Sequence, residues 1–209
     1  MAHDDQVVGD RLAALSPEGR ALFAAGCAER VVEFYRLYDA ETGREGFAVL
    51  RRVLDAVWAS SQGAIDLADV ERELGAVVPD VDVDRAAHAG VANVVGMVVL
   101  CAARARATGK VDDAVRAADH VEEFLEHRFG ASDLAAYHRE LENLRGLSPA
   151  ELIPKVQALN RRGTRNPARK KAEKRERAAR ERLLKLLQAG GANADAVRAL
   201  ALRDRPSVE

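Results

Sequence analysis

The stretch Val91–Ala103, VANVVGMVVLCAA, decides the fold because it is apolar nearly all round. It covers 13 residues and contains a single strongly polar side chain, that of Asn93. Roughly 20 apolar residues are needed for a helix to span a bilayer, so this stretch is too short. A helix that is apolar on every side must be surrounded by other elements. The stretch therefore predicts a buried central helix, running from about Arg85 to Ala107.

On both sides of this stretch, apolar residues recur at spacings of three and four. Such spacing is typical of helices, and no alternating β-branched run between turn residues indicates a strand. Ser16 and Ser148 each precede a proline, which is the usual start of a helix. Gly43, Gly109 and the pair 190–191 indicate helix ends. We predict an all-α protein, a compact bundle of about 8–10 helices with a long basic C-terminal helix.

The expected helices follow from these start and stop signals. Before the central helix we place them at about residues 6–15, 17–41, 47–60 and 66–75. After it we place them at about residues 111–129, 133–144, from Ser148 onward, 167–189 and 195–203. The loop before the central helix contains Pro79 and closely spaced aspartates, which disfavour a helix.

The net charge of −1 conceals an uneven distribution along the chain. Residues 161–209 contain 15 Lys and Arg against 6 Asp and Glu, whereas residues 1–160 contain 17 against 27. We therefore predict two units, an acidic all-helical domain over 1–160 and a basic helical extension over 161–209. Such asymmetry bears on partners and solubility rather than on the fold.

Cysteine usage and the first residues indicate a compartment. Cys27 and Cys101 are the only cysteines, and each lies among apolar residues without a Cys-x-x-Cys partner. They are expected to be reduced core residues. The start, MAHDDQVVGD, has neither the basic nor the apolar region of a secretory signal. We expect a cytoplasmic protein without a cofactor and without membrane attachment.

The string CAERVVEFYRLYDAETGREGFAVLRRVLDAVW, residues 27–58, resembles the YjaG-like bacterial family, a domain of unknown function. The residues that carry the resemblance are Cys27, Glu29, Arg30, Tyr35, Arg52, Leu54, Asp55 and Trp58. The similarity covers roughly residues 11–125. It departs from the pattern at Ala59, where an acidic residue is usual, and nothing after His127 resembles the family. The resemblance implies a compact cytosolic helical domain without a known activity, and members of such families also occur beside toxin genes as immunity proteins.

The same residues also have a purely structural interpretation. Arg51 and Asp55 are four residues apart and are expected to pair on one helix face. If the second and third helices form a hairpin, Arg52 is expected to reach Glu29 or Asp55. Trp58 lies on the apolar face and is most simply a core anchor. This interpretation needs no chemistry, and we favour it.

Candidate catalytic and metal-binding groups are sparse. His120, Glu123 and His127 project from one helix face, which is how a site with two histidines and one carboxylate begins. The second Glu-x-x-His motif of di-iron bundles is absent, so a solvated face is the favoured interpretation. No nucleophile elbow and no phosphate-binding glycine loop occurs. We therefore predict no enzyme activity and no metal, and leave open whether these three side chains bind one.

The basic run near the C-terminus suggests nucleic acid as an alternative ligand. Its candidate phosphate contacts are Arg169, Lys170, Lys171, Lys174, Arg175 and Arg177. No aromatic residue follows Tyr137, so bases would find no stacking platform and binding would be non-specific. The apolar stripe thickens near Leu183, which predicts firm docking at that end of the helix. The other interpretations are a surface helix across the acidic body, or a face for a second copy of the chain.

Taken with the resemblance, these features predict a non-enzymatic cytosolic protein-interaction protein of the immunity type, as in toxin–antitoxin pairs. Many nucleic-acid-degrading toxins are basic, and complementary charge speeds and orients association. The expected contact surface is acidic and comprises Asp80, Asp82, Asp84, Asp112, Asp113, Glu122, Glu123 and Glu126.

Overall fold

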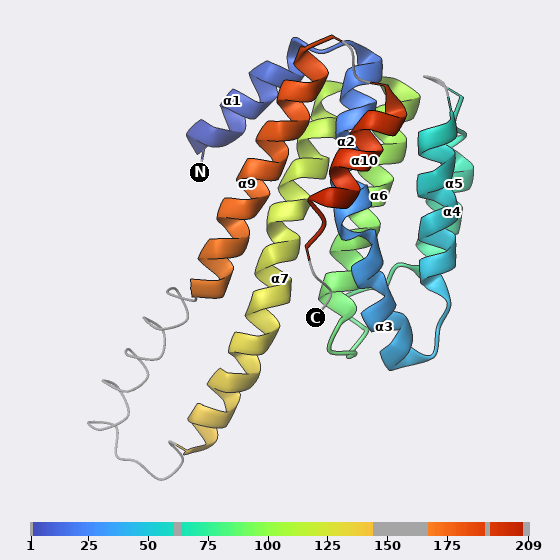
Figure 1. The fold of residues 1–209 in the computed structure, drawn as a ribbon. Coiled ribbons are helices and arrows are strands. Elements are labelled where there is room, and N and C mark those ends of the chain that lie inside the picture. The colour runs from blue at the N-terminus through green and yellow to red at the C-terminus, as the bar shows by residue number, and fades with distance from the viewer. Residues whose placement is uncertain (1, 61–63, 144–166, 191–192, 207–209) are drawn as a thin grey trace.

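The computed structural model describes residues 2–60, 64–143, 167–190 and 193–206, and it describes side chains for 7–60, 64–128, 168–190 and 193–206. In chain order the elements are α1 (Ala2–Ala13), α2 (Pro17–Val31), the 3-10 helix η1 (Val32–Phe34), α3 (Tyr35–Thr42), α4 (Gly46–Ala59), α5 (Leu67–Val77), α6 (Ala89–Thr108), α7 (Val111–Asn143), α9 (Pro167–Gln188) and α10 (Ala194–Arg203). No strand occurs in these ranges, and the helices form one bundle (Figure 1). The predicted all-α class is confirmed.

Helix α6 lies at the centre of the bundle, as the apolar stretch predicted. It packs against α2 and α7 most extensively and also contacts α3, α4 and α5. Within the described residues it is the one helix whose length and composition would suit a membrane span, but 72% of its most apolar window is buried inside the protein. That burial is typical of the core helix of a globular bundle.

Local signals set the ends of several helices. The side chain of Ser16 accepts a hydrogen bond from the Gly19 amide at 3.1 Å, with Pro17 in the first helical position. Helix α6 ends at Gly109, whose φ of 66° is a left-handed conformation that suits glycine. These ends reverse the chain between α1 and α2 and between α6 and α7. Helices α2, α6 and α7 therefore pack side by side (Figure 1).

Two predicted boundaries are wrong. The expected helix over 17–41 is interrupted by η1, although no glycine or proline marks that position. The expected helices over 111–129 and 133–144 are one continuous helix, α7. Its interior glycine, Gly130, costs a helix only about 1 kcal/mol and does not end it. The helix predicted from Ser148 lies outside the described residues.

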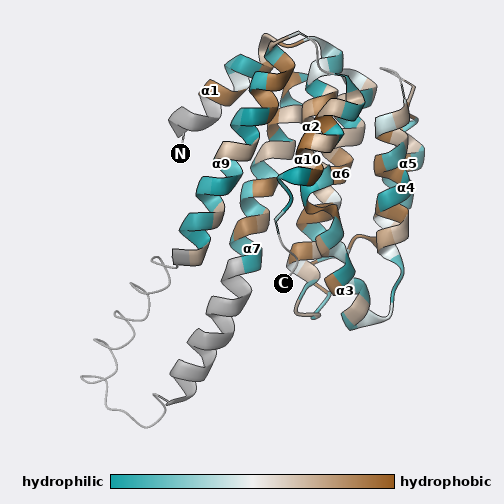
Figure 2. Cartoon of the chain, viewed as in Figure 1, coloured by the Kyte–Doolittle hydropathy of each residue, from teal (hydrophilic) through white to brown (hydrophobic). Residues whose placement is uncertain are grey.

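The segment after residue 166 packs on the N-terminal helices and shares their core. Leu183, Leu184 and Leu187 of α9 and Val197 of α10 belong to the same buried cluster as α2 and α6. A Cβ added at Gly26 of α2 would lie 3.2 Å from Leu183 Cδ1, so the absence of a side chain there permits close approach. Toward its start, α9 shows mainly hydrophilic residues (Figure 2). The C-terminal segment is therefore docked, most firmly through the second half of α9, whereas the predicted boundary between residues 160 and 161 lies outside the described residues.

Candidate functional site

A buried carboxylate on α2 joins three parts of the chain. The Glu29 side chain is 1% exposed and receives two hydrogen bonds from Arg51 of α4, at 2.8 and 2.9 Å. Trp58 Nε1 donates a third at 2.8 Å. From the C-terminal segment, Arg198 lies 3.5 Å away and Arg205 donates at 3.1 Å. We call these five residues the Glu29 cluster.

The Glu29 cluster holds its central carboxylate ionised. Burial alone would raise the pKa of Glu29, but the hydrogen bonds and charge of Arg51 act in the opposite direction. The Trp58 hydrogen bond and the charge of Arg198 add to that effect, and the net result is a pKa below the ordinary value. An ionised carboxylate surrounded by donors is suited to holding helices together. It is poorly suited to accepting a proton from a substrate.

A second buried ion pair joins α2 to α9. The Arg30 side chain is fully buried and donates to both carboxylate oxygens of Glu176, at 3.0 and 2.6 Å. Arg30 Nη2 also lies 3.9 Å from Cys27 Sγ. Burial raises the pKa of that thiol to about 11, against the smaller effect of Arg30, so Cys27 is protonated at neutral pH. This cysteine is therefore a core residue without nucleophilic character.

Most residues that carry the family resemblance meet at these two ion pairs. Asp55 accepts from Arg51 at 2.8 Å, as predicted, and from Arg198 at 2.7 Å. Trp58 is buried, as a core anchor should be. The prediction for Arg52 is wrong, because this arginine points to α5 and donates to Glu73 at 3.0 Å. Arg51, one residue earlier, faces α2 instead, because one step along a helix turns the direction of a side chain by about 100°.

Three of the charged partners were not identified from the sequence. Glu176, Arg198 and Arg205 lie more than 140 residues from their partners on α2. The spacing of charges along the chain carries no signal for such contacts. A hint lay in α2 itself, where Glu29 and Arg30 interrupt an otherwise apolar, buried stretch from Ala21 to Val31. Buried charges require partners, and these had to come from elsewhere in the chain.

The candidate histidine site is held together by one carboxylate. His120 Nδ1 lies 2.9 Å from Glu123 Oε2, and His127 Nε2 lies 3.7 Å from Glu123 Oε1. All three side chains are partly or well exposed on α7. In the part of the chain that the structure describes, no group of three or more His, Cys, Asp or Glu is arranged to hold a metal ion.

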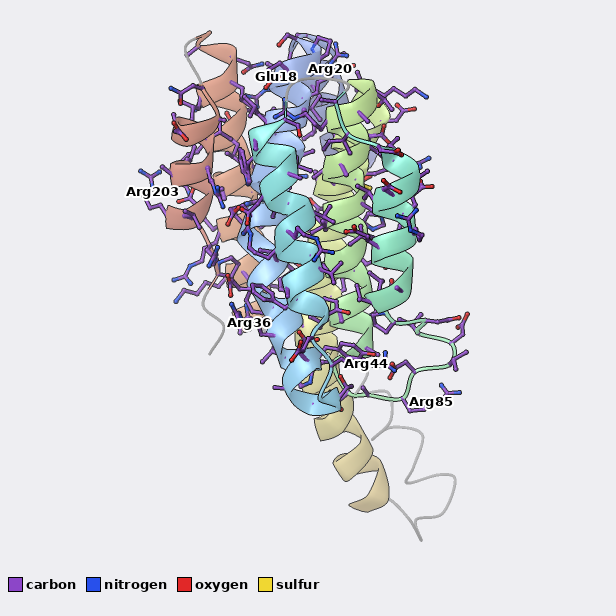
Figure 3. All side chains as sticks on the ribbon, turned by 90° about the vertical axis from the view of Figure 1, so that its right-hand side faces the viewer. Glu18, Arg20, Arg36, Arg44, Arg85 and Arg203 are labelled. Atoms are coloured by element: carbon purple, nitrogen blue, oxygen red, sulfur yellow. The ribbon has the colours of Figure 1, made fainter. Side chains whose placement is uncertain are left out.

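The eight predicted acidic contact residues do not form one surface. Asp80, Asp82 and Asp84 lie in the loop before α6, whereas Asp112 and Asp113 lie just beyond its far end. Twenty residues of helix separate these positions by about 30 Å. Figure 3 marks the two ends, with Arg44 and Arg85 at one and Glu18 and Arg20 at the other.

Several of these carboxylates have internal partners. Asp84 accepts from Tyr38 at 2.5 Å, and Asp113 is buried and accepts from Thr108. Three others lie on α7, where Glu123 pairs with His120 as described. The remaining two face α9 as follows: Glu122 binds Arg180 at 2.7 Å and Glu126 binds Arg169 at 2.9 Å. Among the described residues, Asp80, Asp82 and Asp112 are exposed and form no ion pair.

An apolar groove opens beside the first two of these carboxylates. It lies between α5 and α6, has a volume of about 350 Å³, and is lined by Glu71, Leu74, Gly75, Val78, Pro79, Asp80, Val81, Asn93, Gly96, Met97 and Leu100. In the adjoining loop Val81 is 44% exposed and Val83 is 74% exposed. We call the groove together with residues 80–84 the acidic groove.

The predicted nucleic-acid contacts lie along the exposed side of α9. Arg169 is the exception, because it pairs with Glu126 and with Glu173. The other five are exposed and have no ion pair among the described residues: Lys170, Lys171, Lys174, Arg175 and Arg177.

Comparisons with known proteins give one structural relative of unknown function. No protein-family model and no curated protein matches the chain. Among solved structures, the fold is similar to the crystal structure of a DUF416 family protein from Shewanella baltica, with a TM-score of 0.64 and 16% identity over 94% of this chain and 92% of the other. At this identity the likeness shows the fold, that of a domain of unknown function.

Proposed function

We propose that this protein is a non-enzymatic binding protein whose acidic groove captures a basic protein, in the manner of an immunity protein. The resemblance of residues 27–58 to the YjaG-like family implies a compact cytosolic helical domain with no known activity. The acidic groove carries the proposal, because it combines apolar surface with two exposed carboxylates, Asp80 and Asp82, that form no ion pair with the described residues.

The apolar part of the groove offers a place for a buried side chain. Leu74, Val78, Met97 and Leu100 contribute its apolar walls, the exposed Val81 lies at its edge, and Val83 is exposed two residues further along the loop. Contiguous exposed apolar surface with a polar rim is typical of interaction sites. The groove is therefore expected to take one or two apolar side chains of a partner.

The rim sets the charge of that partner. Asp80 accepts a hydrogen bond from the Asp82 amide at 2.9 Å, which fixes the loop without neutralising either carboxylate. Neither side chain forms an ion pair in the described part of the chain. Complementary charge steers association and penalises wrong partners. We expect a partner segment in which Lys or Arg flanks an apolar residue.

Site-specific cross-linking tests this proposal. A photo-reactive amino acid at Val83 is expected to capture a protein of net positive charge, and the same group at Asp112, at the far end of α6, is expected not to. The double charge reversal Asp80→Lys, Asp82→Lys is expected to abolish capture. A captured protein that is toxic when expressed alone, and harmless with the wild type but not with the double variant, would establish the immunity role. Equal capture from both positions, or capture of an acidic protein at Val83, would refute the proposal.

The exposed cations of α9 favour nucleic acid as a second candidate. Lys170, Lys174 and Arg177 are exposed and without ion pairs among the described residues. Removing all three is expected to reduce the slope of log affinity against log salt by about 3 units on duplex DNA, since each phosphate contact contributes about 0.9. A gel shift across a salt series measures this slope. Absence of a shift at low salt excludes this candidate.

A further inference from the structure

A basic cavity lies between α7, α9 and the chain after α10, away from the acidic groove. It has a volume of about 460 Å³. Six cationic side chains line it: Arg128, Lys171, Arg175, Arg182, Arg203 and Arg205. Figure 3 shows Arg203 at the outer side of the C-terminal helices. No motif places these residues together, because they come from three separate segments.

The two acidic residues of the cavity are already neutralised. Both carboxylate oxygens of Glu176 accept hydrogen bonds from the buried Arg30. Asp204 accepts from Arg182 at 2.8 Å and lies 3.5 Å from Arg203. The cavity therefore keeps a surplus of positive charge, and the low dielectric of its walls strengthens the field inside it.

Two cations of the cavity form no ion pair in the part of the chain that the structure describes. Lys171 and Arg175 lie four residues apart on one face of α9, are exposed, and form no ion pair with the described residues. Opposite them on α7, the Arg128 guanidinium stacks over the Phe34 ring at 4.4 Å from its centroid. Arginine and lysine in this arrangement bind phosphate oxygens, arginine through two parallel hydrogen bonds.

One wall of the cavity is held in place before any ligand arrives. Arg205 is anchored to Glu29 at 3.1 Å and to Glu33 at 3.5 Å, and its buried Nε has no hydrogen-bond partner in the described residues. This wall of the cavity is therefore fixed by the Glu29 cluster. A site that is already formed binds with a smaller entropic cost than one that must be ordered.

The size and lining of the cavity define the ligand. Leu125, Ala168, Ala172 and Pro206 give it apolar surface beside the cations. A cavity of this volume falls in the range of about 300–1,000 Å³ that holds small organic ligands, and it is larger than a single phosphate requires. We propose that the basic cavity binds an organic phosphate of about nucleotide size, with its phosphates on Lys171 and Arg175 and its apolar part against α7 and α9.

Isothermal titration calorimetry with ATP, AMP and inorganic phosphate tests the proposal on the full chain. The double variant Lys171→Ala, Arg175→Ala removes the unpaired cations of the cavity and breaks no ion pair in the described residues. Its matched control is Lys170→Ala, Lys174→Ala, which removes two exposed charges with the same spacing on the same helix, outside the cavity. At about 150 mM salt, unspecific attraction between exposed charges is largely screened.

Saturable binding of a nucleotide is expected for the wild type and the control, with an affinity about tenfold or more lower in the cavity variant. A single-stranded oligonucleotide of roughly 20 residues distinguishes the source of the phosphate. Tighter binding of the nucleotide identifies a free metabolite, and tighter binding of the strand identifies nucleic acid, provided that the cavity variant loses it. No saturable binding, or equal losses in both variants, would overturn the proposal. None of these outcomes depends on the acidic groove.

Discussion

Replacing Glu176 with glutamine is predicted to destabilise the fold more than any surface substitution on α9. Arg30 is fully buried, and both of its hydrogen bonds to oxygen go to Glu176, at 3.0 and 2.6 Å. The other hydrogen-bond acceptor near the Arg30 guanidinium is Cys27 Sγ, at 3.9 Å from Nη2, and Arg30 Nε has no hydrogen-bond partner in the described residues. The amide of glutamine keeps the shape of the side chain but removes the charge. The buried guanidinium of Arg30 then has no negative charge beside it to offset its own charge.

Removing one partner of a buried ion pair costs about 3–5 kcal/mol. For a chain of 150–250 residues each kcal/mol lowers Tm by about 2–4 °C, so Glu176→Gln is expected to lower Tm by roughly 6–20 °C. Its control is Glu173→Gln, whose pair with Arg169 at 2.8 Å is partly exposed and four residues apart. Such pairs contribute about 0.3–0.5 kcal/mol.

Urea denaturation followed by circular dichroism measures both variants. The combined substitution Arg30→Met, Glu176→Leu serves as a second control, because replacing both charges with apolar side chains is often neutral or stabilising. We expect the double variant to be more stable than Glu176→Gln alone. Equal stability of Glu176→Gln and Glu173→Gln would refute the argument that α2 and α9 are joined by a buried charge pair.

The remaining predictions concern packing, thiols and acid. Gly96→Ala is expected to lower the free energy of unfolding, measured by urea denaturation, by about 1–3 kcal/mol, because the new Cβ would lie 2.3 Å from Val78 Cγ2. An unchanged urea midpoint would contradict this and show that Val78 can move aside at little cost. Burial raises the pKa of Cys27 and Cys101 to about 11, so a thiol reagent at about pH 8 is expected to modify both only after denaturation, and rapid labelling of the native protein would contradict this. The lowered pKa of Glu29 means that the unfolded chain takes up its proton first. The contribution of Glu29 to stability is therefore complete above its ordinary pKa of 4.5 and falls with decreasing pH below it, and urea midpoints that rise below about pH 4.5 would contradict this.

Local patterns explain how much of the fold was predictable. The central helix was identified because a stretch of thirteen residues that is apolar except for Asn93 permits few arrangements other than a surrounded helix. Ser16 and Gly109 act within one turn of their helix ends, so their signals are legible in a single sequence. The continuity of α7 was missed because Gly130 weakens a helix without ending it.

The contacts of the candidate sites were less predictable because they depend on the relative rotation of helices. The pairing of Arg51 with Asp55 is a property of one helix and was predicted correctly. The rotation of α4 against α2 decides whether Arg51 or Arg52 faces Glu29. The sequence analysis assigned this contact to Arg52, but Arg51 makes it. The acidic residues were grouped by composition, which does not tell which face or end each occupies. The basic cavity was missed for the same reason.

The distribution of charge in space differs from its distribution along the chain. Several cations of α9 and α10 form ion pairs with carboxylates of earlier helices. Arg180 pairs with Glu122 of α7, and Arg198 pairs with Asp55 of α4. Among the described residues, the acidic groove and the basic cavity each keep charges without an ion pair, Asp80 and Asp82 in the first and Lys171 and Arg175 in the second. The C-terminal segment is therefore a wall of the bundle rather than a separate cationic arm.

Amide hydrogen exchange tests most directly whether the C-terminal segment is a wall of the bundle. The amides of residues 183–187 and 197–201 lie in helices whose buried side chains share the core with α2 and α6. They are expected to exchange with protection approaching that of α6, because exposing them requires breaking the buried pairs of Glu29 and Arg30. Exchange of both segments at the rate of a free chain, with α6 still protected, would contradict this and show a segment that is detached from the bundle.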